Sequence, residues 1–252
     1  PEKMTRKFRP VHTLIHAAGL CNIALAFTLP TLAQQMLPAA DQSAFNAIGR
    51  VNIAGYKSRS MCTGTLIASD RVITAAHCLR GPGGNFADPG EIHFLAGYRQ
   101  GHMAAHSTGA RILVACENAG RNANLTSIQD DLAILELAAP ISANLIKPLQ
   151  LEDQSSPADT YQIIAYRHDR PHIISEQTGC TKIARNDFLL QLSCAVAPGN
   201  SGGPVLVQRS DGWRIAAIVS ASSPRGALVV LPQTKRLHAI GTAEGDQPQQ
   251  SD

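Results

Sequence analysis

The sequence predicts an all-β protein made of two halves, each folded as a closed antiparallel barrel. Short apolar runs of strand length recur along the 252 residues, separated by turn-forming clusters such as Gly-Pro-Gly-Gly-Asn at 81–85. No long stretch has a helical pattern of apolar residues before 233–240, where a short C-terminal helix is expected. The polar segment 151–160 contains Pro157 and separates the runs into two similar sets, so it is the predicted linker.

The expected strands fill both halves of the chain. In the N-terminal barrel, residues 48–150, they are 48–53, 65–68, 72–76, 92–96, 111–115 and 132–137. In the C-terminal barrel, residues 161–240, they are 161–166, 173–175, 189–192, 205–208, 214–220 and 227–231. Residues 34–47 show no clear periodicity and are interpreted as a lead-in or a short propeptide. The polar tail 241–252 is expected to be disordered.

The N-terminus has the layout of a secretory signal peptide. Four basic residues within the first nine positions precede an apolar run at 14–29 and a small-residue segment that ends at Ala33. The run is about 16 residues long and contains His16 and Asn22, whereas a spanning helix needs roughly 20 apolar residues. We therefore expect cleavage after Ala33, export to the periplasm or the medium, and no stable membrane anchor afterwards.

Charge and aromatic content argue against a nucleic-acid partner. The leader holds four of the 22 basic and one of the 19 acidic residues, so the mature chain carries 18 of each. No basic stripe remains, and 4% aromatic residues offers little surface for base stacking.

Five cysteines lie beyond the predicted leader, which suits an oxidising compartment. Because five is an odd number, one must stay free or pair outside the chain. Cys62 with Cys78 and Cys180 with Cys194 form two local pairs beside the chemical motifs described next, so Cys116 is the candidate for the unpaired thiol.

The segment 199–204, Gly-Asn-Ser-Gly-Gly-Pro, presents a serine between glycines. A serine hydroxyl is a weak nucleophile that needs a base beside it and donors aimed at the oxyanion, here the N–H groups of Gly199 and Ser201. The segment also matches the G-x-S-x-G elbow of α/β-hydrolases. A strand-like run follows at 204–207 where an elbow requires a helix, and Asp211 comes too soon to serve as that fold's acid.

A histidine and an aspartate upstream complete a possible acid–base set. His77 ends the apolar run 73–77 and has the side chain best suited to proton transfer near neutral pH. Asp131 heads the apolar run 132–137, and a carboxylate drawn into the structure there would need a partner. Each residue taken alone has a structural interpretation: His77 as a buried core histidine and Asp131 as a solvated turn residue.

The order His, Asp, Ser along the chain favours catalytic over purely structural roles for the three residues, because it is the order of the chymotrypsin arrangement. The segments 62–67 (CTGTLI), 73–78 (ITAAHC), 131–135 (DLAIL) and 199–204 (GNSGGP) resemble the signature segments of trypsin-like serine peptidases. The pattern is most similar to secreted bacterial V8-like and trypsin-like members. The resemblance implies two six-stranded chymotrypsin-like barrels.

The resemblance also implies a role for individual residues. His77 is similar to the general base, Asp131 to the orienting acid and Ser201 to the nucleophile, with Gly199 and Ser201 supplying the oxyanion hole. Ser220 is similar to the serine that supports the buried acid. The implied disulfides are Cys62–Cys78 and Cys180–Cys194.

Departures from the vertebrate digestive pattern bear on activation and specificity. Asn200 stands where those enzymes have the aspartate that receives a new amino terminus, so activation by that ion pair is not expected. The implied substrate pocket is formed by Ala195, Val196, Ser220, Ser222 and Gly226. It has no carboxylate, which favours a small or apolar side chain over Arg or Lys.

The predicted function is therefore that of a secreted serine endopeptidase acting on proteins or peptides. No cofactor and no metal is expected, because the polar segment 168–172, with two histidines and an aspartate, matches no metal-ligand spacing. The alternatives are a catalytically silent homologue that acts as a binding module and, less favoured, an esterase. The sequence indicates no oligomeric state.

Overall fold

The computed structural model describes residues 33–53, 60–122, 124–153, 158–233 and 237. The predicted leader up to residue 32, the tail 241–252 and most of the expected helix at 233–240 lie outside these residues. No helix among the described residues is both long and apolar enough to cross a membrane.

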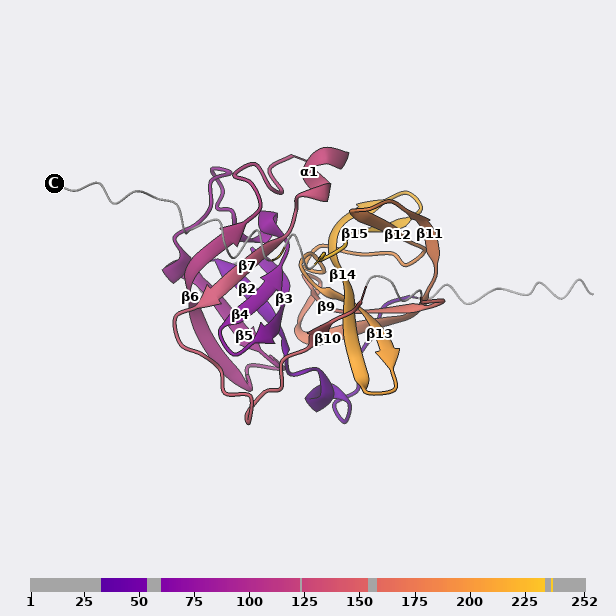
Figure 1. Cartoon of the computed structure of the whole chain (residues 1–252). Coiled ribbons are helices and arrows are strands. Elements are labelled where there is room, and N and C mark those ends of the chain that lie inside the picture. The colour runs from indigo at the N-terminus through magenta and orange to yellow at the C-terminus, as the bar shows by residue number, and fades with distance from the viewer. Residues whose placement is uncertain (1–32, 54–59, 123, 154–157, 234–236, 238–252) are drawn as a thin grey trace, which may run out of the picture. The chain divides into compact units, whose positions relative to one another are not determined.

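The N-terminal half is a closed six-stranded barrel with the strand order β2-β3-β4-β7-β6-β5 (Figure 1). Its strands pair antiparallel throughout. Alternate apolar side chains fill its interior, where Leu66, Val72, Phe94 and Leu135 are fully buried. The six strands are β2 (Ile48–Ile53), β3 (Met61–Ala68), β4 (Arg71–Thr74), β5 (Ile92–Ala96), β6 (Ala105–Val114) and β7 (Ala133–Leu137).

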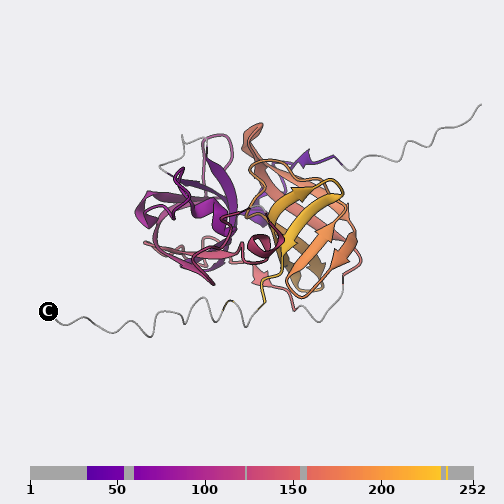
Figure 2. The same cartoon turned by 90° about the horizontal axis from the view of Figure 1, so that it is seen from above.

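The C-terminal half is a curled nine-stranded sheet, which forms the second lobe in Figures 1 and 2. Its main path runs β1-β10-β9-β13-β14-β15-β12-β11, and β8 pairs in parallel with β14. Its strands are β1 (Gln35–Met36), β8 (Gln150–Leu151), β9 (Tyr161–Arg167), β10 (Arg170–Cys180), β11 (Lys182–Arg185), β12 (Leu189–Leu192), β13 (Pro204–Arg209), β14 (Gly212–Ser223) and β15 (Gly226–Val230).

Closure of this second half differs in detail from a continuous six-stranded ladder. Only Thr181 separates β10 from β11, yet β10 pairs with β9 and β11 pairs with β12. One interrupted stretch of chain therefore bridges the two ends of the sheet. The Cys180–Cys194 disulfide and the hydrogen bond from Ser193 N to Thr181 O, 2.9 Å, hold the interruption together. The predicted all-β, chymotrypsin-like fold is confirmed, with one correction: the second half is a curled nine-stranded sheet in place of a closed antiparallel barrel of six strands.

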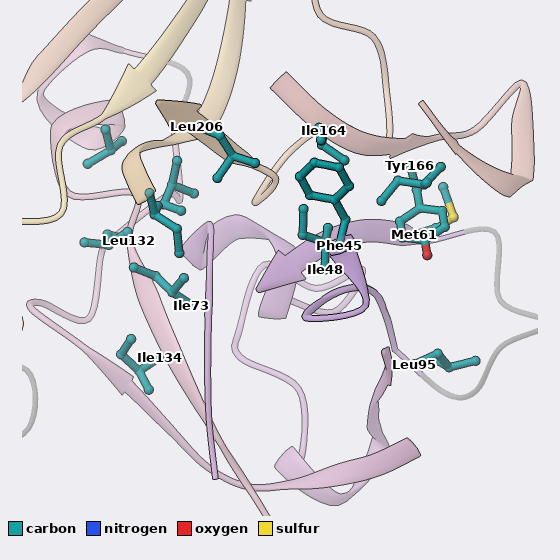
Figure 3. Packing of buried hydrophobic residues seen from close by; sticks show 14 of the residues in the cluster. Phe45, Ile48, Met61, Ile73, Leu95, Leu132, Ile134, Ile164, Tyr166 and Leu206 are labelled. Carbon is teal, nitrogen blue, oxygen red and sulfur yellow. The ribbon is translucent and has the colours of Figure 1, made fainter. Parts of the chain in front are cut away.

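Apolar side chains from both halves share one core. Ile48 and Ile73 of the first barrel pack in the same cluster as Ile164, Tyr166 and Leu206 of the second (Figure 3). Each such large side chain contributes about 1.5–3 kcal/mol when it is fully buried. The shared core therefore fixes the boundary between the barrels, where the site lies.

The segment predicted as a lead-in is folded onto the second sheet. β1 pairs with β10, and a short 3₁₀ helix, η1 (Gln42–Phe45), places the Phe45 ring 5.8 Å from that of Trp213. Leu37 and Phe45 are buried in the shared core. The other short helices are η2 (Ala76–Leu79), η3 (Pro89–Glu91) and α1 (Leu125–Gln129), the last begun by the Asn124 side chain, which accepts from Ser127 N.

Candidate active site

His77 and Asp131 are brought together by the strand pairing of the first barrel. β4 and β7 are adjacent, with Thr74 opposite Ala133. His77 lies in η2, just after β4, and Asp131 lies two residues before β7, so the ladder sets their separation. The Asp131 carboxylate accepts from His77 Nδ1 at 2.7 Å and from the His77 backbone N–H at 2.9 Å.

Asp131 is almost fully buried, and the second barrel supplies its third hydrogen bond. Only 2% of the residue is exposed, and the Ser220 hydroxyl of β14 donates to Oδ2 at 2.5 Å. A buried carboxylate remains charged only when donors surround it, and three donors do so here. Because Nδ1 of His77 donates to Asp131, its Nε2 is left with a free lone pair, as a proton acceptor requires.

A loop that the sequence did not single out covers this pair. Gly120 has φ +65°, and a Cβ there would overlap Asp131 Oδ1 and lie 2.6 Å from His77 N. Arg80, at the end of η2, holds the loop: its guanidinium donates to Ala119 O at 2.8 and 3.0 Å and to Glu117 O at 2.5 Å. The glycine thus lets the backbone close directly over the carboxylate and exclude water.

Ser201 lies in the loop between β12 and β13, and Asn200 fixes that loop from inside. The Asn200 side chain is fully buried; its Oδ1 accepts from Ala197 N and its Nδ2 donates to Tyr166 O, both at 2.8 Å. An amide can make both bonds at once, whereas a carboxylate can only accept. The loop is therefore tied to β9 without any ionic partner.

Every carbonyl of residues 198–201 has a hydrogen-bond donor. Pro198 O accepts from His168 N, and Asn200 O from Gly203 N, both at 2.9 Å, while Thr63 binds the carbonyls of Gly199 and Ser201. Within the described chain, the N–H groups of Gly199 and Ser201 have no acceptor. Two unpaired N–H groups on either side of Asn200 are suited to bind a developing oxyanion.

A cavity of about 360 Å³ opens beside Ser201. None of its lining side chains is charged. The lining residues are Val196, Ala197, Pro198, Ser201, Val219, Ser220, Ala221 and Ser222.

Three of the five predicted pocket residues, Val196, Ser220 and Ser222, line this cavity together with Ser201. Ala195 instead lines a second cavity, which shares Val196 and Ala197 with the first. Gly226 lines neither; it has φ +131° and lies 3.1 Å, measured from an ideal Cβ, from Cys194 O. No hydrogen bond joins Ser201 Oγ to His77 Nε2 among the described residues.

The cysteines form the two disulfides Cys62–Cys78 and Cys180–Cys194, and Cys116 is free and exposed. His77, Cys62 and Cys78 bring their ligand atoms within 4.8 Å of one another. Because the two sulfurs are bonded to each other, neither is available as a thiolate, and this cluster cannot serve as a metal site.

The segment 168–172, weighed above as a metal site, has structural contacts instead. Arg167 pairs with Asp169 at 2.7 Å, His168 Nε2 lies 2.7 Å from Met61 O, and His172 Nδ1 lies 3.0 Å from Tyr98 Oη. The hydrogen bond raises the pKa of Arg167 and lowers the pKa of Asp169. These contacts tie the β9–β10 turn to the first barrel.

Comparisons with known proteins agree on one family. The model of the Trypsin family matches residues 39–229, whereas no curated protein matches the chain. A Glu endopeptidase structure is similar with a TM-score of 0.66 and 18% identity, over 84% of this chain and 97% of the other. The protease Anisep from Arthrobacter nicotinovorans gives 0.62 and 16%, over 83% and 100%.

The secreted serine protease VesC from Vibrio cholerae is similar with a TM-score of 0.60 and 16% identity, over 79% of this chain and 45% of that one. At these identities the three structures show the fold alone, whereas the family model covers most of the sequence. The chain belongs to the trypsin family and is a serine-type endopeptidase of the chymotrypsin-like fold.

Proposed function

We propose that this endopeptidase acts through Ser201 as nucleophile, His77 as general base and acid, and Asp131 as the group that orients His77. The observation that carries the proposal is the buried Asp131 carboxylate, which receives Nδ1–H of His77 and the hydroxyl of Ser220. This arrangement leaves Nε2, the other ring nitrogen of His77, able to accept a proton. A carboxylate so placed also stabilises the imidazolium that forms during catalysis.

The proposed reaction proceeds in two halves. Ser201 Oγ attacks the peptide carbonyl carbon while Nε2 of His77 takes its proton, and the carbonyl oxygen becomes an oxyanion held by the N–H groups of Gly199 and Ser201. The C–N bond then breaks as Nε2–H gives its proton to the leaving amine. Water, deprotonated by the same nitrogen, hydrolyses the acyl-enzyme and restores Ser201.

The missing hydrogen bond between Ser201 and His77 is compatible with this scheme. Catalytic hydrogen bonds are often long in a site without substrate and tighten only in the Michaelis complex.

The cavity beside Ser201 supports a preference for small or apolar side chains before the scissile bond. Val196, Val219 and Ala221 give its walls apolar surface, and no acidic or basic side chain lines it. A buried charge on the substrate would stay unpaired there, at a large desolvation cost. The preference expressed in the name Glu endopeptidase is therefore not carried over to this chain.

The first experiment is labelling of the purified protein with a fluorophosphonate probe. We expect the label on Ser201, and we expect Ser201→Ala to lose both the label and about 10⁴–10⁶ of the turnover of peptide substrates. Peptidase activity retained in Ser201→Ala would contradict the assignment. Absence of label in the wild-type protein would point to a silent binding module, and turnover of esters without peptides to an esterase.

Acidification gives a second test of His77. We expect kcat/KM for a peptide to fall between about pH 8 and pH 5, because the imidazole must be unprotonated to accept the serine proton. A flat profile over that range would reject His77 as the base.

We further propose that the enzyme is exported, because two disulfides form and persist in oxidising compartments. The predicted leader supports the same conclusion. Sequencing the amino terminus of the protein recovered from the periplasm and the medium should give a chain beginning at Gln34. An intact leader in both fractions would contradict this proposal.

A further inference from the structure

We infer that Thr63 is a positioning residue that sets the geometry of the oxyanion hole from the opposite barrel. Thr63 lies on β3 of the first barrel and is fully buried, so it does not touch substrate. All of its hydrogen-bonding groups are used, and three of the four reach the second barrel. This inference rests on the proposed role of Ser201.

The hydroxyl of Thr63 joins two segments of the second barrel. It donates to Gly199 O at 2.8 Å and accepts from Tyr166 N at 3.0 Å. The backbone N–H of Thr63 donates to Ser201 O at 2.8 Å, and its carbonyl accepts from Thr74 Oγ1 at 2.8 Å. One residue thus holds the carbonyls on both sides of Asn200.

These two carbonyls control the freedom that the loop would otherwise have. Gly199 has φ +94° and Gly202 has φ +76°, and glycines at both positions leave the backbone torsions between them weakly restrained. The bond to Gly199 O holds the peptide plane between Gly199 and Asn200, and so restrains the ψ angle of Gly199, which lies between the two N–H groups. The bond to Ser201 O anchors the backbone just after the Ser201 N–H. The Thr63 hydroxyl therefore helps to keep the N–H groups of Gly199 and Ser201 in the relative direction that an oxyanion needs.

The position of Thr63 also connects the two catalytic halves. The preceding residue, Cys62, is bonded to Cys78, and Cys78 directly follows His77. The same short stretch of β3 therefore contacts the turn that carries the base and the loop that carries the nucleophile. A shift of this strand would move both groups together.

Thr63→Val tests the inference, because valine keeps the shape and loses the hydroxyl. Gly199 O would lose its donor, and a displacement of about 1 Å at a catalytic group can cost up to about 10²-fold in rate. We expect kcat to fall about 10- to 100-fold with KM within about threefold of wild type. Thr63→Ser, which keeps both hydroxyl bonds, should restore kcat to within about threefold of wild type.

Two threonines of the same barrel provide matched controls. Thr65 is fully buried two residues further along β3, and its Oγ1 has no partner among the described residues, so Thr65→Val should leave kcat and stability nearly unchanged. Thr74→Val removes the single bond to Thr63 O and should lower stability, by less than Thr63→Val, which loses two bonds, with kcat within about threefold of wild type.

The rate of fluorophosphonate labelling of Ser201, corrected for the titrated fraction of sites, should fall in parallel with kcat in Thr63→Val. If Thr63→Val keeps its kcat while its Tm falls at least as far as that of Thr74→Val, Thr63 is only structural and the inference is wrong. Thr63→Ala replaces the valine variant if that one does not fold, with the same expected loss, and kcat within threefold of wild type would overturn the inference. Failure of Ser201 itself is recognised separately, from an unlabelled wild-type protein.

Discussion

The proposed acid–base half of the site and its proposed nucleophile half are held in different ways. His77 and Asp131 belong to one barrel and meet because adjacent strands β4 and β7 place them there. Ser201 lies on a loop of the other barrel, and its position depends on Thr63 across the boundary and on Tyr166 and Asn200 within its own barrel. Strand pairing between β4 and β7 positions His77 and Asp131, whereas hydrogen bonds from side chains position the loop of Ser201.

This difference implies different sensitivities. Changes in the first half should act mainly on proton transfer, since the strands themselves hold the residues in place. Changes in the second half should act on the direction of backbone N–H groups, since no ladder defines the loop. The predictions below separate the two effects.

The largest effect is expected from Asp131→Asn. The amide would donate to Nδ1 of His77 in place of accepting from it, which puts the proton on Nε2 and removes the base. We expect kcat to fall about 10⁴-fold with the fold intact. The control is Asp130→Asn at the neighbouring acid, whose carboxylate lies 3.7 Å from Cys116 Sγ. It should keep kcat within about threefold of wild type, and a comparable loss there would contradict the assignment.

Asn200→Asp should break the nucleophile half. A carboxylate can accept from Ala197 N, but it faces Tyr166 O with no donor and is fully buried. We expect kcat/KM to fall about 10²-fold near neutral pH, with a lower Tm. Asn186→Asp is the matched change, because Asn186 uses only its oxygen, toward Phe188 N and Leu189 N, and is exposed. Equal effects of the two variants would exclude a special role for the Asn200 amide.

Arg80→Met should loosen the loop over Asp131 without touching the chemistry directly. Contacts of the guanidinium with Glu117 O, Ala119 O and Gly84 O would be lost, and hydrogen bonds to a charged group are worth about 1.5–3 kcal/mol. We expect a drop in kcat/KM of about tenfold. Arg121→Met, which changes an exposed side chain of the same loop, should leave kcat/KM nearly unchanged. If the two variants have the same kcat/KM, the Arg80 contacts are not needed to hold the loop.

The smallest effect is expected from Glu176→Gln, far from the site. Burial, and secondarily Asp41, raises the pKa of Glu176. A raised acid pKa means that the folded state binds more protons than the unfolded chain, so stability falls as pH rises through that window. The variant should show a slightly higher Tm than wild type near pH 7 and no difference below about pH 4. Thermal unfolding at the two pH values measures this, and a variant with a lower Tm at pH 7 would contradict it.

How much of the candidate site the sequence predicts depends on whether a residue acts through its side-chain chemistry or through its contacts with the backbone. The segments around His77, Asp131 and Ser201 carry their chemistry in residue types, so they can be recognised without coordinates. Thr63 and Arg80 act by donating hydrogen bonds to backbone carbonyls. Gly120 acts because it has no side chain, which lets the backbone approach Asp131. No residue pattern marks such contacts, and the strand pairing that creates them joins positions far apart in the chain.

The strands show the same limit. β6 runs from Ala105 although its apolar pattern begins only at Arg111, and β10 extends from Arg170 to Cys180 around a short apolar centre. Hydrogen bonds to a neighbouring strand can extend a polar segment that periodicity leaves unassigned. The lead-in 34–47 was likewise judged by its polar residues, whereas Leu37 and Phe45 decide where it packs.

The Asn200 amide has a consequence for how a cell could keep this enzyme in check. The neutral Asn200 side chain already holds the loop that carries Ser201. The loop therefore needs no new, positively charged amino terminus, released by proteolytic cleavage, to complete it. On the proposed mechanism, such an enzyme would be able to cleave proteins as soon as it folds. Because its two disulfides favour an oxidising compartment, proposed export would separate folding, and with it activity, from the proteins of the cell that makes it.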